Sequence, residues 1–416
     1  MCIFLFHYQI KNAHANTFLI AFLFFKRVLS NPLFKNSLKN SAALTWIIEI
    51  QHKHNLKDKL NKELPTPLHN SQCVVYKHEI LICGGTQQRT CYSYHTFKNE
   101  YKLICEYPSD VILKGHCVVK LVDNDNNQIT LLSFGSDWCG ENKHTLVMKY
   151  VSIWGNISNK LNKSNEFNNY NQWIPFTDNH NHSIIIGRDE NYNYIGARAV
   201  VGGRNNHLLF ITYGRNDISV FDLNTFQFIK HDILPTKDNV LFQCFVSKSE
   251  NRQEMMKTNK QNYQMILFCQ RTGLLIEYDE DNNTFQFHRL PVCDDIARFY
   301  SYAYVCINDI ILFFGGCSWE YFVDTVVSKS AHKYSIRENK WTTFQSTLPS
   351  PLRDCVAILN EEDNHIHIIG GEDERAIVST HMKTNVRLWD PSYLVMICLF
   401  ILMKQNKLYC IKLIDK

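Results

Sequence analysis

The chain has 416 residues, with 44 Lys and Arg against 40 Asp and Glu, so its formal net charge is +4. Charges this evenly balanced exclude a polyelectrolyte tail and argue against a nucleic-acid binder that relies on neutralising phosphates. Hydrophobic residues make up 45% of the chain, which suffices for a large core, and only 16 Gly and 10 Pro exclude collagen-like and Pro/Gly-rich disordered classes. The length fits two or three ordinary domains, or one large β or repeat domain.

The first 54 residues contain apolar runs that are interrupted by His, Lys and Arg. The longer run, Thr17–Phe25, has nine residues, against the roughly 20 that a membrane-spanning helix needs. No basic stretch precedes it and no small-residue cleavage site follows, which disfavours a signal peptide. We therefore expect an irregular or helical extension over residues 1–54.

From about residue 64 to 390 the apolar residues recur with a period of two, which is typical of β-strands. Short runs of β-branched and aromatic residues are separated by Asn, Asp and Gly, the residues of tight turns. Six of these runs stand out as central strands: Glu79–Cys83, Gln128–Phe134, His207–Tyr213, Gln264–Cys269, Asp309–Phe314 and His365–Ile369. Each follows another apolar strand, and two further strands follow most of them, so the pattern indicates six four-stranded units.

An aromatic pair, its members seven residues apart, marks the turn between the third and fourth strands of four units. The pairs are Tyr94 with Tyr101, Phe221 with Phe228, Tyr278 with Phe285, and Tyr334 with Trp341. Asn, Asp and Glu between the two aromatic residues suit a compact hairpin turn. The fourth strand then runs into Leu-Pro or Tyr-Pro, because Pro lacks the amide donor that a continuing strand needs.

Six small sheets in an open row would leave faces and edges bare, whereas a closed ring leaves only short, protected edges. The sequence therefore predicts an all-β fold, a six-bladed β-propeller with four-stranded blades. The predicted blades cover residues 64–108, 116–176, 197–235, 243–291, 301–349 and 354–390.

These blades resemble the kelch repeat, in which a strand that ends in Gly-Gly is followed by a loop and by a Tyr and a Trp six to seven residues apart. The matching residues are Gly84, Gly85, Tyr94 and Tyr101, then Gly315, Gly316, Tyr334 and Trp341, and finally Gly370 and Gly371. The resemblance covers about four-fifths of the chain, and it implies a six-bladed, kelch-like propeller of the galactose oxidase-like superfamily. Two blades keep a single glycine and one keeps neither.

Ring closure in kelch-like propellers usually takes a strand from the opposite terminus. Blade six has no hairpin after Pro391, so we expect residues 55–62 to supply its fourth strand and the propeller to span residues 55–390. The remaining residues, 391–416, are predicted to form an apolar extension, because the run Tyr393–Met403 is too short to span a bilayer comfortably.

The 15 cysteines include no CxxC pair, and most lie in apolar, strand-like runs. Cysteines of this kind behave as small hydrophobic residues, which predicts a reducing, cytoplasmic environment.

No catalytic or metal-binding motif stands out. His365 and His367 project from one face of a strand, but a third ligand in register is missing, so we expect packing or hydrogen bonding there. Asp294 and Asp295 lie in a turn-like stretch and are expected to be solvated. We therefore expect no metal, no cofactor and no catalytic activity. Some kelch-like propellers are copper-radical oxidases that use a Tyr–Cys–His constellation, and an oxidase-like, metal-dependent enzyme remains the alternative.

The loops between the second and third strands are the candidate binding surface, because they gather at one mouth of a propeller. In kelch proteins such loops commonly contact protein ligands. The candidate loops here are 86–91, 317–330 and 372–384. Arg89 and Arg375 suit recognition of carboxylates, while Trp319 and Tyr321 are of the types enriched at interface hot spots.

The sequence therefore predicts a non-catalytic, cytoplasmic protein-interaction module or scaffold that binds a protein partner at one mouth of the ring. By family association alone, the partner belongs to ubiquitin-ligase or cytoskeletal machinery. Nucleic acid is not expected as a partner. A propeller anchored to a membrane by one of its apolar ends is a further alternative.

Overall fold

The computed structural model describes residues 62–122, 127–137, 139–155, 169–187, 193–248, 262–318 and 325–389. The predicted extensions over 1–54 and 391–416, and nearly all of the predicted closing strand over 55–62, lie outside these ranges. In the described part of the chain, no helix combines the length and the hydrophobicity that a membrane crossing requires.

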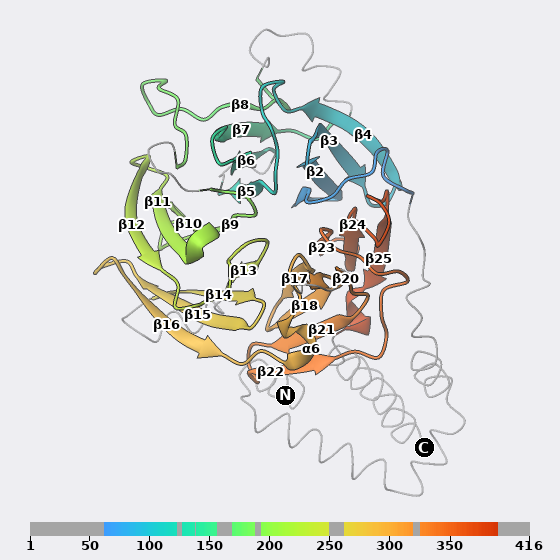
Figure 1. The fold of residues 1–416 in the computed structure, drawn as a ribbon. Coiled ribbons are helices and arrows are strands. Elements are labelled where there is room, and N and C mark those ends of the chain that lie inside the picture. Colours follow the sequence, from blue (N-terminus) through green and yellow to red (C-terminus); the bar gives the residue numbers. More distant parts are fainter. Residues whose placement is uncertain are drawn as a thin grey trace, which may run out of the picture. The chain divides into compact units, whose positions relative to one another are not determined.

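The strands of the described residues form six antiparallel blades around a central axis, together with one small two-stranded sheet (Figure 1). Blade one contains β1 (Gln72–Tyr76), β2 (Glu79–Gly85), β3 (Gln88–His95) and β4 (Glu100–Glu106). Blade two contains β5 (Cys117–Leu121), β6 (Ile129–Gly135), β7 (His144–Tyr150) and β8 (Ile174–Pro175). Blade three contains β9 (Arg198–Gly202), β10 (Leu208–Tyr213), β11 (Asp217–Asp222) and β12 (Gln227–Ile233).

The second half of the ring repeats this order. Blade four contains β13 (Cys244–Ser247), β14 (Tyr263–Cys269), β15 (Thr272–Asp279) and β16 (Thr284–Leu290). Blade five contains β17 (Ala303–Ile307), β18 (Ile310–Phe314), β21 (Ala331–Ser335) and β22 (Lys340–Thr343), with the small β19 (Cys317–Ser318) and β20 (Val326–Val327) pair between β18 and β21. Blade six contains β23 (Val356–Asn360), β24 (His365–Ile369) and β25 (His381–Asn385). The prediction of a six-bladed, all-β propeller is confirmed.

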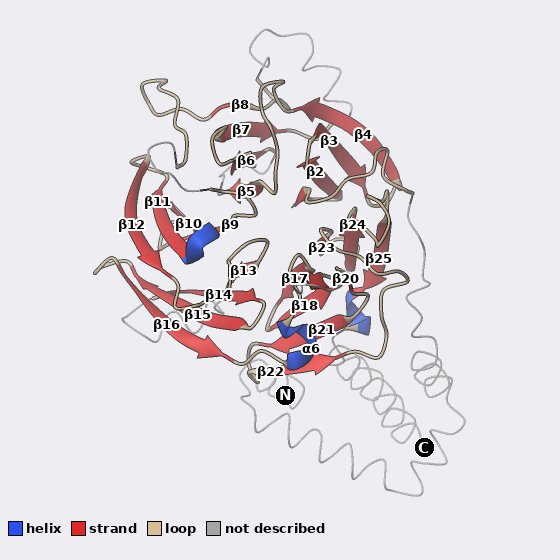
Figure 2. Cartoon of the chain, viewed as in Figure 1, coloured by secondary structure: helices blue, strands red, loops and turns tan. Residues whose placement is uncertain are grey.

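Among the described residues, helical structure is confined to short connecting segments (Figure 2). The segment η2 (Gly214–Asn216) follows β10, α6 (Asp294–Ala297) links blade four to blade five, and η3 (Val386–Leu388) follows β25.

Burial differs between inner and outer strands, as a ring of sheets requires. Every residue of β2 is buried, because this strand has a neighbouring blade on each face and therefore carries an almost continuous apolar run. The outer strand β12 alternates between exposed and half-buried residues, since one of its faces meets water.

Six hydrophobic clusters hold the ring together, one at each contact between neighbouring blades. We call such a contact a seam. At the seam between blades six and one, Ile369 of β24 packs with Leu68, Ile80 and Tyr94. The two ends of the described chain therefore meet in the same way as blades that are consecutive in sequence, and the ring is closed.

The double glycines let the backbone of the next blade approach closely. A Cβ atom on Gly315 would lie 2.1 Å from the carbonyl oxygen of Leu352, and one on Gly370 would lie 2.3 Å from that of Leu68. Both glycines also have positive φ, 67° and 65° respectively. Only glycine fits such a position, because it has no Cβ and enters the left-handed region without strain.

The predicted aromatic pairs lie directly opposite each other across the third and fourth strands. Their ring centroids are between 4.9 and 5.2 Å apart. Where the first member is Tyr, its hydroxyl donates a hydrogen bond to an Asn five residues later: Tyr94 to Asn99, Tyr278 to Asn283, and Tyr334 to Asn339. Each of these Asn residues has positive φ, so the pair and its turn form one repeated unit.

Closure of blade six can be followed to the first described residues. The amide of Leu64 donates to the carbonyl of Ser379, 3.0 Å away, just before β25. In blade five the amide of Leu348 donates to Lys329, just before β21, at 2.8 Å. Leu64-Pro65 therefore holds at blade six the position that Leu348-Pro349 holds at blade five, after the fourth strand.

The described cysteines are all free. Seven of these twelve are buried, including Cys83 in β2 and Cys244 in β13, in agreement with their expected role as small hydrophobic residues.

Candidate functional site

One mouth of the ring is built from the segments that lead into the six innermost strands. The residue two positions before each of these strands has positive φ, between 51° and 64°: Asn70, Gly115, Gly196, Phe242, Ser301 and Asp354. Four of the six are not glycine, and such residues rarely adopt this conformation. Non-glycine residues held there carry strain of about 1–3 kcal/mol each, and such positions cluster at functional sites.

Backbone hydrogen bonds between neighbouring blades link these positions into a rim. The amide of Gly196 donates to Gly115 at 2.9 Å, and that of Phe242 donates to Gly196 at 3.0 Å. On the other side of the ring, the amide of Asp354 donates to Ser301 at 2.9 Å, and that of Asn70 donates to Asp354 at 2.8 Å. The rim is therefore fixed by main-chain contacts whose formation does not depend on the side chains it presents.

A cavity of about 580 Å³ lies inside this rim, within the size range of small-ligand sites. Its wall on blades three and four includes the apolar Ile195, Leu241 and Phe242. The wall on the remaining blades is polar, and it is formed by His69, Asn70, Lys114, Tyr300, Ser301, Cys317, Arg353, Asp354 and Glu372. The wall on blades three and four also contains the polar Asn193 and Asn239 and the charged Arg215, so the apolar side chains form a patch within a mainly polar opening.

Arg353 and Glu372 form the centre of the charged wall. Their side chains pair at 2.6 Å, and their backbones exchange two hydrogen bonds of 2.9 Å. The Nδ1 atom of His69 lies 3.5 Å from the Glu372 carboxylate, and the Arg353 Nε atom lies 4.0 Å from Asp354. The guanidinium thus lies between two carboxylates that belong to the same blade.

Burial dominates the protonation of this wall. It raises the pKa of Asp354, although a hydrogen bond with Ser301 and the charge of Arg353 oppose it. It lowers the pKa of Lys114, against the pull of Asp354 and Glu372, and it lowers the pKa of His69. Burial therefore disfavours the charged form of each of these groups relative to water. A charged group that enters the cavity would shift their pKa values again.

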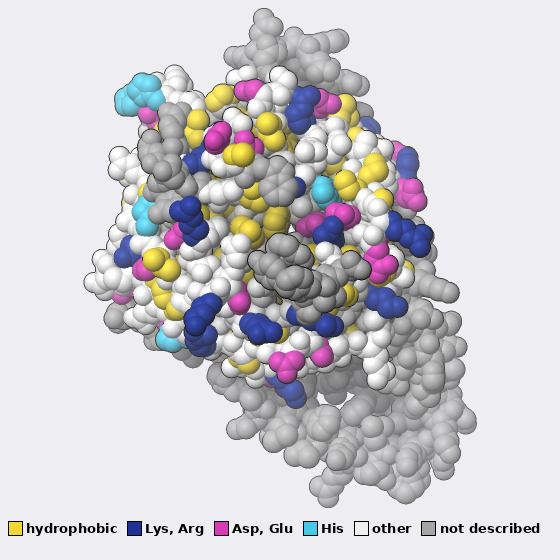
Figure 3. All heavy atoms as spheres, viewed as in Figure 1, with side chains coloured by type: hydrophobic (Ala, Val, Ile, Leu, Met, Phe, Trp, Pro, Cys, Tyr) yellow, Lys and Arg dark blue, Asp and Glu magenta, His cyan; other side chains and the backbone are white. Residues whose placement is uncertain are grey.

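Basic and acidic side chains are interspersed over the face of the ring that is seen in Figure 3. No single-sign patch dominates this view, which agrees with the small net charge of the chain.

The residues predicted to bind a partner lie in different places. Arg89, in β3, places its guanidinium 3.8 Å from Glu106 and 3.4 Å from the carbonyl of Tyr107. Arg375 is exposed in the turn that follows Glu372. Neither side chain lines the cavity, although the second-to-third-strand loops do contribute Cys317 and Glu372 to it.

Trp319 and Tyr321 lie outside the described residues.

His367 is fully buried and hydrogen bonded, as expected. Its Nε2 atom lies 3.1 Å from the Asp363 carboxylate, and its Nδ1 atom lies 2.9 Å from Nε2 of His381. His381 in turn contacts the Tyr101 hydroxyl of blade one. The network therefore belongs to the seam between blades six and one and does not line the mouth.

The mouth residues escaped sequence reasoning because the six segments share a conformation and not a residue type. The pairs that end at the positive-φ position are His-Asn, Lys-Gly, Ile-Gly, Leu-Phe, Tyr-Ser and Arg-Asp. The usable signal is position: these pairs end two residues before each predicted inner strand.

No protein-family model matches the chain, and no curated protein matches it. Among solved structures, one described as "Structure of YjhT" is similar to it, with a TM-score of 0.55 and 13% sequence identity. The match covers 79% of this chain and 98% of that one. At this identity the likeness concerns the fold alone, and it supports the assignment of the chain as a β-propeller.

Proposed function

We propose that the protein is a non-catalytic binding module that holds a polypeptide partner at the mouth formed by the six inner-strand segments. The observation that carries this proposal is the rim itself: strained backbone positions, linked across blades by main-chain hydrogen bonds, surround a cavity that presents an apolar patch beside charged groups. A preorganised opening of this kind lowers the entropy cost of binding.

The partner group that suits the cavity is a protruding loop or terminus with an apolar side chain next to a charged one. The apolar part would contact Leu241 and Phe242, and the charged part would exchange contacts with Arg353 and Glu372. Arg89, near the start of β3, and Arg375, in the turn after Glu372, would add contacts at the edge. The kelch-type role and the cytoplasmic location inferred from the sequence belong to this same proposal.

Gly214 offers a way to fill the cavity without disturbing the fold. It lines the cavity, its φ is not positive, and an added Cβ would meet only ordinary contacts at 3.6 Å. Glu338 is the matched control: it is exposed in the turn between β21 and β22, at the end of the blade opposite the mouth. An aromatic residue introduced there leaves the cavity open.

The test is affinity capture with the wild type, Gly214→Phe, Glu338→Phe and the double variant Arg89→Ala with Arg375→Ala. We expect Gly214→Phe to lose the partner, Glu338→Phe to retain it, and the double variant to weaken it. Equal melting temperatures would show that the fold is intact. Retention of the same partner by Gly214→Phe at wild-type level would overturn the proposal for the cavity.

A second candidate, a metal-dependent oxidase, is favoured by one observation. Tyr300 and Cys317 lie side by side in the cavity wall, exchange two backbone hydrogen bonds of 2.9 Å, and share the cavity with His69. Ligand atoms of His69, Asp354 and Glu372 lie within 4.8 Å of one another. Against this reading, the Arg353 guanidinium already pairs with Glu372, where it would repel a cation.

Metal analysis of the purified protein separates the two candidates. Stoichiometric copper that is lost in a His69→Ala variant would favour the oxidase. Copper absent from wild-type protein that has been reconstituted with the ion would favour the binding module.

A further inference from the structure

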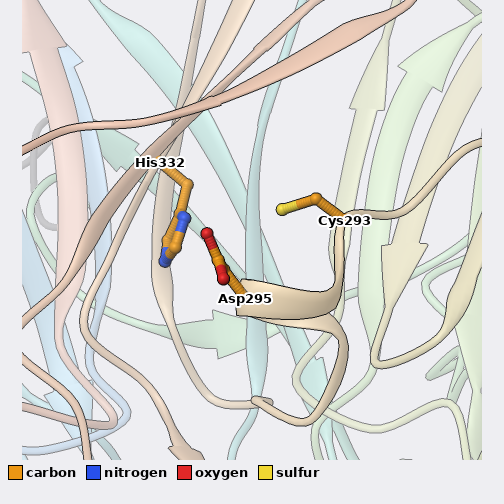
Figure 4. Close-up of side chains that lie close together, drawn as sticks. All are labelled: Cys293, Asp295 and His332. Atoms are coloured by element: carbon orange, nitrogen blue, oxygen red, sulfur yellow. The ribbon is translucent and has the colours of Figure 1, made fainter.

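A second group of polar side chains lies where blade four passes into blade five, outside the lining of the cavity. Cys293 precedes the short helix α6, Asp295 lies within it, and His332 lies on β21 (Figure 4). One ligand atom from each residue lies within 4.8 Å of the other two. His332 is buried, Cys293 is half-buried and Asp295 is exposed, so the group opens to solvent on the side of the carboxylate.

We propose that Cys293, Asp295 and His332 form a binding site for one Zn²⁺ ion, with water as the fourth ligand. A thiolate, an imidazole and a carboxylate are the three ligand types that Zn²⁺ takes in proteins, at about 2.0–2.3 Å in a tetrahedral arrangement. A thiolate and an imidazole together select against Ca²⁺ and Mg²⁺, which prefer oxygen ligands.

The residues around the group already orient two of these ligands. The Nε2 atom of His332 lies 2.8 Å from the Ser330 hydroxyl, and the Thr343 hydroxyl donates to the Asp295 carboxylate at 2.7 Å. Zinc-binding histidines almost always use their second ring nitrogen as a donor, and zinc-binding carboxylates are themselves hydrogen bonded. Ser330 and Thr343 hold the places of these supporting groups.

The hydrogen bonds around His332 indicate which ring nitrogen would bind the metal. Its Nδ1 atom lies 3.2 Å from the Thr343 hydroxyl, which has given its one proton to Asp295. Nδ1 therefore carries the ring proton when no metal is bound, and Nε2 accepts from Ser330. Moving that proton to Nε2 lets Nε2 donate to Ser330 and frees the Nδ1 lone pair on the side of Asp295.

The charges of neighbouring side chains favour metal binding at Cys293, Asp295 and His332 over metal binding at the mouth. Arg353 pairs with Glu372 at 2.6 Å in the mouth cluster, so a guanidinium already satisfies that carboxylate. In the part of the chain that the structure describes, no Lys or Arg forms an ion pair with Asp295. A bound cation would therefore meet an unneutralised carboxylate, and it would fasten α6 to the outer half of blade five.

The test uses the full chain, freed of metal with a chelator and titrated with Zn²⁺ by calorimetry and with Co²⁺ by absorption spectroscopy. Cys293→Ser and Asp295→Asn remove single ligands. Cys139→Ser is the matched control, because Cys139 is an exposed cysteine elsewhere in the chain. Melting temperatures without metal confirm that all four proteins are folded.

We expect the wild type and Cys139→Ser to bind one Zn²⁺ with equal affinity and to show a thiolate-to-cobalt charge-transfer band. Asp295→Asn should bind Zn²⁺ at least about tenfold more weakly, and Cys293→Ser should also lose the band. Equal zinc affinity of the wild type and Cys293→Ser would overturn the proposal, as would a wild type without a saturable site.

Discussion

The seam between blades six and one and the mouth both place histidines beside carboxylates, yet they differ in how completely these groups are satisfied. At the seam, Asp363, His367, His381 and Tyr101 form one continuous chain of contacts, and both histidines are fully buried. At the mouth, His69 Nδ1 and Arg353 Nε are buried but lack a hydrogen-bond partner among the described residues.

This difference separates a structural network from a binding site. A buried network in which every polar group is hydrogen bonded rigidifies a fold. Removing one member leaves the others buried without a hydrogen-bond partner, which lowers the stability of the fold. At the mouth, about a quarter of each side chain of the Arg353–Glu372 pair is exposed, so its charged groups can reach a ligand. The same residue types therefore stabilise the ring at the seam and, in our proposal, hold a partner at the mouth.

The largest expected effect is on stability, and it distinguishes a glycine at the seam from a glycine at the mouth. Gly370→Ala places a Cβ 2.3 Å from the Leu68 carbonyl oxygen at a positive φ, so we expect a loss of about 3 kcal/mol or more in the free energy of unfolding. Gly214→Ala meets only contacts of 3.6 Å at the mouth, and it should change stability by less than about 0.5 kcal/mol. Urea denaturation measures both, and equal losses would refute the proposed difference in packing.

The second prediction concerns the stability of the fold at low pH. Burial lowers the pKa of His367 and His381 at the seam. Burial also lowers the pKa of His116 to about 3 and that of His144 to about 4 at the seam between blades one and two. These groups bind protons more readily in the unfolded chain, so stability must fall as the pH drops below the unfolded value of 6.5. His116 alone should remove about 2 kcal/mol between pH 6.5 and pH 5.

One substitution sharpens this prediction. His381→Asn should reduce the difference in unfolding free energy between pH 7 and pH 5, because one buried histidine no longer titrates. Equal pH dependence of the wild type and His381→Asn would contradict a role of the seam network in acid sensitivity.

The fold could be predicted from the sequence because its determinants are local and repeated. Gly315-Gly316, the Tyr334–Trp341 pair and Leu348-Pro349 fall in order within one blade, and related triplets recur around the ring. In each triplet the glycines allow a close approach at a seam, the aromatic pair forms a cross-strand contact, and Leu-Pro ends a strand. Repetition allowed weak single motifs to support one another.

The site could not be predicted in the same way. Asp354 lies at the mouth beside Asn70 and Ser301, which belong to two other blades, and the three residue types share no pattern. His381 is 14 residues from His367 and was not identified as its partner. Only the closed ring brings Asp354, Asn70 and Ser301 together. His367 and His381 meet across the neighbouring strands β24 and β25, and the sequence does not show the register in which these strands pair.

A small effect on stability, second only to that of the Gly214→Ala control, is expected for the ion pair at the mouth. Glu372→Gln keeps the shape of the side chain and removes its charge from Arg353 and His69. Because both members of the Arg353–Glu372 pair are about a quarter exposed, with 26% and 24% of their side chains accessible, water already screens their attraction. We expect a loss of at most about 1 kcal/mol in the free energy of unfolding.

Binding should respond to Glu372→Gln far more than stability does, if the mouth holds the partner. Affinity capture should then show a clear loss, with a melting temperature close to that of the wild type. The reverse result, a large loss of stability with unchanged capture, would place Arg353 and Glu372 with the seam network as a structural contact. The distinction between the two regions would then lie in their position alone and not in their role.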